Sequence, residues 1–183
     1  KKALKIKSDH FYAYTNLGIA QKNLNHLQEA ILSFDKAIEI NKNFVEAYNN
    51  RGDVFSSLHL YEKALADYER VLQLNSNFDY ILGKVLYYKM TLCDWSNFEL
   101  ISEKISNKIE RGHKVTEPFC FLLISDKSAS KKLSAEIFSE DNFAIKINNK
   151  PIIKYNNKKP KIAYFSADFY NHATLHLMMD IFK

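Results

Sequence analysis

Apolar and small residues recur in this chain with a period of 34 positions, so that Gly18 returns as Gly52. The first copy consists of aromatic, aliphatic and small positions at helical spacing: Tyr14, Leu17, Gly18, Ala30, Phe34 and Ala37. The second copy holds similar residue types and one arginine: Tyr48, Arg51, Gly52, Ala64, Tyr68 and Val71. Each copy predicts two antiparallel helices, in which the glycine faces the first alanine and the aromatic residues fill the space around them.

This period and pattern resemble the tetratricopeptide repeat. We place two repeats at residues 11–78 and interpret residues 1–10 as the end of a preceding repeat. Proline, which often closes such a unit, is absent here, so the helix ends are predicted at asparagines: Asn41, Asn43, Asn75 and Asn77. The first part of the chain is therefore expected to be a mainly α-helical solenoid.

A degenerate third repeat is expected at residues 79–112, with Leu86 at the glycine position and Phe98 at the small position. Cys93-Asp94-Trp95 falls where the turn between its two helices should lie. Ser96 and Glu99 have the spacing of a capping box for the second helix, and Gly112 is the predicted stop. A helical connector at residues 113–145 and a Lys/Asn-rich linker at residues 146–160 are expected to follow.

From residue 161 the pattern changes to that of a buried strand. Ile162–Ala167 is apolar or small at nearly every position, which is typical of a strand covered on both faces in a parallel α/β sheet. Turn residues follow, and Thr174 can cap a helix that begins after it. Residues 161–183 therefore predict the first strand and helix start of a Rossmann-like α/β domain. Because the chain begins with Lys1 rather than Met and stops inside this pattern, we expect both ends to be cut.

Several exact sequence runs resemble the O-GlcNAc transferase family, including its bacterial members. They are Phe165–Phe169, Asn171-His172-Ala173-Thr174, His176-Leu177-Met178, Cys93–Phe98 and Glu117-Pro118-Phe119. The resemblance implies an inverting glycosyltransferase with two Rossmann-like halves (the GT-B type), which moves GlcNAc from UDP-GlcNAc to Ser or Thr of proteins held by the repeats. The second half would lie beyond Lys183, so this stretch alone is expected to be inactive.

The same resemblance implies roles for residues near the C-terminus. His172 matches a histidine in the active-site cleft of the family, where it either acts as a base or shapes the cleft. Thr174 contributes a hydroxyl and backbone amides to substrate binding, or only caps the helix. Asp168 and His176 are interpreted as structural residues near the site. No metal is expected, and UDP-GlcNAc is a substrate rather than a bound cofactor.

A binding role is predicted for two asparagines of the repeats. Asn16 and Asn50 occupy the same register, two residues after Tyr14 and Tyr48, which places them off the packing stripe and on an open face. A carboxamide both donates and accepts hydrogen bonds, so a row of them can hold a peptide backbone. In the family that this chain resembles, repeated asparagines hold extended acceptor polypeptide. Ordinary surface asparagine is the alternative, since the third register position is Lys84.

Composition limits the other possibilities. The net charge of +5 is modest, and a Lys/Asn-rich run near residue 150 indicates a solvated linker rather than a nucleic-acid-binding arm. Cys93 and Cys120 are too few for a disulfide framework or a zinc site, and we expect both to pack as small apolar residues. The longest apolar run, Phe119–Ile124, is far too short to span a bilayer. A soluble, cytoplasmic protein without membrane contact is the expectation.

Two alternatives remain open at this point. The chain is a non-catalytic tetratricopeptide adaptor that recruits partner proteins, or it belongs to a related glycosyltransferase that uses another donor sugar. The residues that choose the donor and the acceptor protein are not in this sequence.

Overall fold

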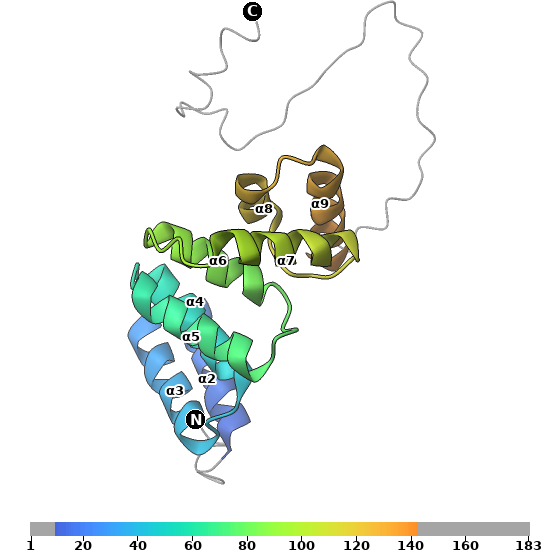
Figure 1. Cartoon of the computed structure of the whole chain (residues 1–183). Coiled ribbons are helices and arrows are strands. Elements are labelled where there is room, and N and C mark those ends of the chain that lie inside the picture. The colour runs from blue at the N-terminus through green and yellow to red at the C-terminus, as the bar shows by residue number, and fades with distance from the viewer. Residues whose placement is uncertain (1–9, 143–183) are drawn as a thin grey trace, which may run out of the picture. The chain divides into compact units, whose positions relative to one another are not determined.

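A computed structural model of the chain describes residues 10–142. This part consists of eight α-helices and contains no strand (Figure 1): α2 (Phe11–Asn23), α3 (Leu27–Ile40), α4 (Val45–Ser57), α5 (Tyr61–Leu74), α6 (Ile81–Thr91), α7 (Phe98–Glu110), α8 (Pro118–Ile124) and α9 (Ser128–Asn142). The predicted linker and α/β domain start lie outside the described residues.

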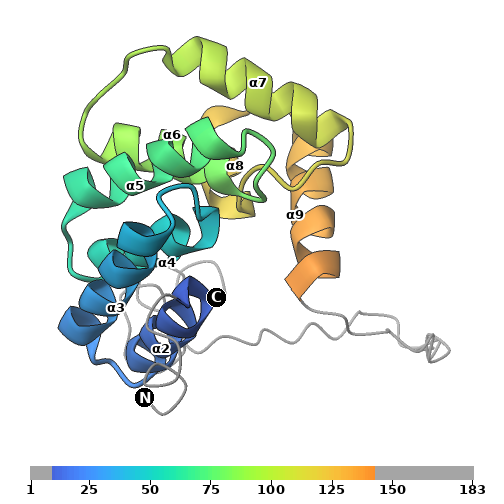
Figure 2. The ribbon, with the colours of Figure 1, turned by 90° about the horizontal axis from the view of Figure 1, so that it is seen from below.

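Successive helices pack against one another in chain order from α2 to α7, as Figure 2 shows. Two positions after the last residue of the first helix in each pair, the chain takes the left-handed conformation: at Asn25 (φ 61°), His59 (φ 58°) and Cys93 (φ 56°), which are 34 positions apart. In each case the next N–H reaches back five residues, from His26 to Gln21, Leu60 to Phe55 and Asp94 to Lys89. These are Schellman motifs, so α6 and α7 form a third pair in register with the first two.

The second helices of the first two pairs stop at asparagine, as predicted. Asn41 and Asn75 have extended backbones directly after α3 and α5. Their side-chain oxygens accept hydrogen bonds from the N–H groups of Asn43 at 3.1 Å and Asn77 at 3.0 Å. An Asx turn of this kind gives the chain a local alternative to continuing the helix, which explains the stop without proline.

The repeat glycines lie against aromatic rings of the second helices. A Cβ atom on Gly18 would lie 2.7 Å from the Phe34 ring, and one on Gly52 would lie 2.8 Å from the Tyr68 ring. Ala30 and Ala64 are fully buried. Glycine is therefore required where an aromatic ring on the second helix crosses the backbone of the first.

The capping-box prediction for α7 is wrong. The residue before α7 is Asn97, in the left-handed conformation, and no side chain caps the helix. Ser96 instead donates its N–H to the Asp94 carboxylate at 2.9 Å, and its hydroxyl accepts from Lys89 at 3.2 Å. These bonds fold the turn, and the Ser96 N–H that Glu99 would bond in a capping box is already donated to Asp94. Gly112 (φ 79°) ends α7 as predicted.

The segment after Gly112 is an integral part of the third pair. Val115 and Phe121 are buried in one core cluster with α6 and α7 residues such as Leu82, Leu86 and Ile105. The first turn of α6 donates two hydrogen bonds to this segment, from Tyr80 to Lys114 and from Gly83 to Val115, both at 2.8 Å. They satisfy N–H groups that a helix N-terminus leaves without intrahelical partners. Helices α8 and α9 then pack on each other, α8 against α6 and α9 against α7.

Candidate functional site

Polar side chains connect the first helices of the three pairs in one row. Lys22 on α2 lies 3.8 Å from the Asp53 carboxylate on α4, and Lys84 on α6 donates to the same carboxylate at 2.7 Å. The three side chains are 27%, 30% and 24% exposed, so solvent and a ligand can reach them. We call Lys22, Asp53 and Lys84 the lysine–aspartate row. One carboxylate between two ammonium groups gives the row a net positive charge.

Asparagine carboxamides and tyrosine hydroxyls hold this row in place. Lys22 also donates to Asn50 at 3.4 Å, and Lys84 donates to Asn49 at 3.1 Å. The Tyr68 hydroxyl donates to Asp53 at 2.8 Å, and the Lys84 ammonium lies 4.9 Å from the centre of the Tyr68 ring. Burial and the charge of Asp53 raise the pKa of Tyr68 well above its usual value, so this phenol remains a donor.

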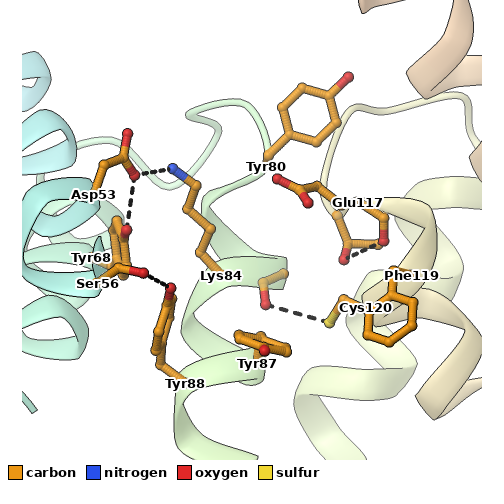
Figure 3. A pocket seen from close by; sticks show the side chains of 12 residues that line it. Asp53, Ser56, Tyr68, Tyr80, Lys84, Tyr87, Tyr88, Glu117, Phe119 and Cys120 are labelled. Atoms are coloured by element: carbon orange, nitrogen blue, oxygen red, sulfur yellow. Dashed lines mark hydrogen bonds and ion pairs between the residues drawn. The ribbon is translucent and has the colours of Figure 1, made fainter. Parts of the chain in front are cut away.

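A cavity of about 450 Å³ lies beside the row, between α4, α5, α6 and the start of α8 (Figure 3). Its lining is rich in aromatic rings and carries both acidic and basic groups: Asp53, Ser56, Tyr68, Tyr80, Gly83, Lys84, Tyr87, Tyr88, Thr116, Glu117, Phe119 and Cys120. Gly83 lets α6 lie directly against Thr116 in the cavity wall, because a Cβ atom at residue 83 would collide with Thr116. The cavity thus depends on the close approach of α6 to the segment before α8.

The two asparagines predicted to bind peptide differ in their surroundings. Asn16 is exposed on α2. Asn50 is half-buried, donates to the Glu46 carbonyl at 2.8 Å and accepts from Lys22. Their contact with a peptide stays a prediction. Sequence reasoning missed Asp53, although its position three residues after Asn50 places both on one face of α4.

Other residues noted in the sequence have structural roles or lie elsewhere. Cys120 packs in the interior as expected, with its thiol 3.6 Å from the Gly83 carbonyl, and burial raises its pKa. Cys93 is exposed, contrary to the expectation, because it occupies the left-handed turn position after α6. His172, Thr174, Asp168 and His176 lie outside the described residues.

Arg51 joins three helices within the repeats. It forms a two-point ion pair with the Asp67 carboxylate, at 2.8 and 2.6 Å, and a third bond of 2.5 Å to Asp35. Its guanidinium also lies 5.6 Å from the rings of Tyr48 and Phe55. The carboxylates raise the pKa of Arg51 against the opposing effect of burial. With Asp67 only 5% exposed, this cluster stabilises the packing of α3, α4 and α5 rather than binding a ligand.

The part of the chain that the structure describes contains no cluster of three or more metal-binding side chains. Within the same residues, no helix is both long and apolar enough to cross a membrane.

Comparisons with known proteins agree with these helix pairs. Residues 11–44 and 45–78 each match the family model of the tetratricopeptide repeat, so the chain contains two such repeats. No curated protein sequence matches the chain.

Two solved structures show the same fold. The structure of YrrB, described as a TPR protein with an unusual peptide-binding site, is 15% identical, with a TM-score of 0.51 over 77% of this chain and 65% of that one. The structure of MamA is 18% identical, with a TM-score of 0.54 over 77% of this chain and 84% of that one. The chain thus spans less than two thirds of the YrrB structure. Neither the repeat model nor these structures is specific to O-GlcNAc transferases, so that resemblance stays a prediction.

Proposed function

We propose that the helical repeats bind an extended segment of a partner protein along the face formed by α2, α4 and α6. The observation that carries this proposal is the lysine–aspartate row, which crosses all three helices and remains partly exposed. Its ammonium groups donate hydrogen bonds, and the neighbouring asparagine carboxamides donate and accept them. A peptide backbone presents carbonyl and N–H groups that such a row can pair. YrrB, which has a similar fold, is itself described with a peptide-binding site.

The arrangement favours binding because it is preorganised. Asp53 already holds Lys84 at 2.7 Å and accepts from Tyr68, so little side-chain freedom remains to be lost when a partner binds. Each new hydrogen bond contributes about 0.5–1.5 kcal/mol when both groups are neutral and about 1.5–3 kcal/mol when the donor is an ammonium group. Several such bonds along the row give an affinity of moderate strength, which is typical of a reversible interaction module.

Selection from a library of random 12-residue peptides on phage, with the purified chain as bait, tests this function. Enriched peptides are then synthesised with a fluorophore and titrated by fluorescence polarisation. We expect Lys84→Met to weaken binding about tenfold, whereas Lys104→Met, an exposed lysine on α7, leaves it unchanged. Thermal melting of both variants checks that they fold. The proposal fails if no peptide is enriched, or if the Lys84 and Lys104 variants bind equally well.

The asparagine prediction is tested with the same peptides. Asn16→Ala combined with Asn50→Ala should weaken binding, with most of the loss from the exposed Asn16, whose carboxamide has no hydrogen-bond partner among residues 10–142. Unchanged affinity in the double variant would make both residues ordinary surface asparagines.

We also propose, as a second function, that this chain is part of an inverting glycosyltransferase that modifies the proteins its repeats hold. The support is the sequence of residues 165–178, which resembles the start of the O-GlcNAc transferase catalytic domain. The donor would be UDP-GlcNAc or, in a related enzyme, another sugar nucleotide. His172 would then lie in the cleft.

The source DNA downstream of Lys183 gives the first test, and a transfer assay with radiolabelled UDP-GlcNAc on the longer protein gives the second. Loss of transfer in His172→Ala is the expected result. A stop codon directly after Lys183, or full transfer by the variant, would contradict this second proposal.

A further inference from the structure

Most polar groups in the 450 Å³ cavity already have partners inside the protein. Asp53 is bonded to Lys84 and Tyr68, Tyr88 is bonded to Ser56, and the Tyr80 hydroxyl donates to Asp141 at 2.8 Å. Thr116 donates to a backbone carbonyl at 3.3 Å. These bonds shape the cavity, and Lys84, which belongs to the lysine–aspartate row, keeps one of its three ammonium N–H groups for a partner.

Two lining groups remain without a partner among residues 10–142: the Glu117 carboxylate and the Tyr87 hydroxyl. Figure 3 shows the Glu117 carboxylate turned away from Phe119 and toward the space between Lys84 and Tyr80. An ionised carboxylate accepts hydrogen bonds and donates none, and a phenol can also accept. The complementary ligand is therefore a donor, and the carboxylate charge favours a cation.

The rings around these two groups favour the same kind of ligand. Tyr87 is 38% exposed and Phe119 is 66% exposed, so their rings are accessible at the opening of the cavity. Tyrosine and phenylalanine rings attract cations to their faces, and a planar guanidinium stacks on them. The rings thus add a binding surface for a flat cationic group.

Carboxylates gather at this end of the cavity. Asp141, bonded to Tyr80 and paired with Lys114, and Asp79, whose charge acts on Tyr80, lie beside it. Glu117 adds a third carboxylate, and the nearby ammonium groups of Lys114 and Lys84 are already paired, with Asp141 and Asp53. At the opposite end, Asp53 is offset by Lys22 and Lys84. A cation entering from the partner is drawn toward Glu117 and away from the lysine–aspartate row.

We propose that this cavity binds an arginine side chain of the partner segment, with its guanidinium paired to the Glu117 carboxylate and the Tyr87 and Phe119 rings lining its approach. The inference rests on the proposed peptide-binding function and adds the residue that the site selects. Lysine is expected to bind more weakly, because an ammonium group neither stacks on a ring nor matches a carboxylate at two points.

The phage-selected peptides provide the test. We expect the enriched peptides to share an arginine, and replacement of that arginine by citrulline, which keeps the shape and removes the charge, to weaken binding about tenfold. In the Glu117→Gln variant the arginine and citrulline peptides should bind alike. Glu103→Gln, which makes the same charge change on the exposed side of α7, should keep the tenfold difference.

The outcomes separate this inference from the function on which it rests. Enriched peptides without a shared arginine, or equal binding of the citrulline peptide, would overturn the arginine site and leave peptide binding intact. A tenfold preference that persists in Glu117→Gln would place the arginine elsewhere and also overturn it. Failure to enrich any peptide would overturn both.

Discussion

Gly83 is the position at which the structure makes its sharpest stability prediction. It lies in the first turn of α6, where intrinsic helix propensity favours alanine over glycine by about 1 kcal/mol. Local reasoning therefore predicts that Gly83→Ala stabilises the protein. The tertiary structure predicts the reverse, because the added Cβ atom would meet the side chain of Thr116 and lie 2.6 Å from its backbone Cα atom.

The destabilisation expected for Gly83→Ala depends on how far Thr116 can move away from the added Cβ atom. Overpacking a dense interior costs about 1–3 kcal/mol, and a backbone neighbour cannot rotate away as a side chain can. Moving Thr116 also stretches the 2.8 Å bond from Gly83 to Val115, which is worth about 1 kcal/mol. After subtraction of the helix-propensity gain, Gly83→Ala should lower the free energy of unfolding by about 2 kcal/mol.

Urea denaturation followed by circular dichroism measures this change, and hydrogen exchange of the amides in residues 113–121 locates it, since helical-repeat proteins can open in parts. Gly83→Ala combined with Thr116→Gly should recover part of the loss. Gly112→Ala is the matched control: nothing lies within 4 Å of its added Cβ atom, so it costs only the left-handed backbone, about 1 kcal/mol. A Gly83→Ala variant as stable as the native chain, or more stable, would refute the reasoning.

Two further predictions concern ion pairs. Arg51→Met leaves the buried Asp67 without its ion-pair partner and should lower the free energy of unfolding by about 3 kcal/mol. The double variant Arg51→Met with Asp67→Leu should lower it clearly less. Equal losses of the two variants in urea denaturation would contradict a coupled pair. The Asp141 pKa lies below its usual value because Lys114, and to a lesser extent Tyr80, donate hydrogen bonds to its carboxylate. The stability that ionised Asp141 gives to the packing of α9 is therefore present above about pH 4 and is lost as the pH falls through the lowered pKa of the folded state. Protection of the α9 amides from hydrogen exchange, corrected for the intrinsic exchange rate at each pH, should therefore fall on acidification in the native chain and change less in Asp141→Asn. Identical pH profiles of protection would rule this out.

Much of the repeat architecture could be predicted from the sequence because its causes are local. The 34-residue period, the stops at Asn41 and Asn75 and the end of α7 at Gly112 each depend on residues within one or two helical turns. The capping box predicted at Ser96 was wrong, although the residues involved are close in sequence. Its spacing fits the motif, yet Asp94 and Lys89 compete for the same groups once the turn folds.

The candidate site was less accessible to sequence reasoning. Asn16 and Asn50 could be placed on an open face from their register, but the role of Asp53 depends on Lys22 and Lys84, which come from two other helices. Glu117 precedes a short helix and matched a family run, with nothing in its neighbours to indicate a cavity. An ion pair between side chains 31 positions apart produces no recognisable spacing in the sequence of either helix.

By itself, the sequence determined that this chain forms paired helices with a tetratricopeptide period, because hydrophobic spacing and turn residues act over short distances. Only the tertiary structure decided that Gly83 must be glycine and that the cavity exists. Both depend on the segment before α8 returning to the first turn of α6, where two backbone hydrogen bonds and a shared core hold it. The tight contact of Gly83 with Thr116 is a property of that return and is encoded in neither segment alone.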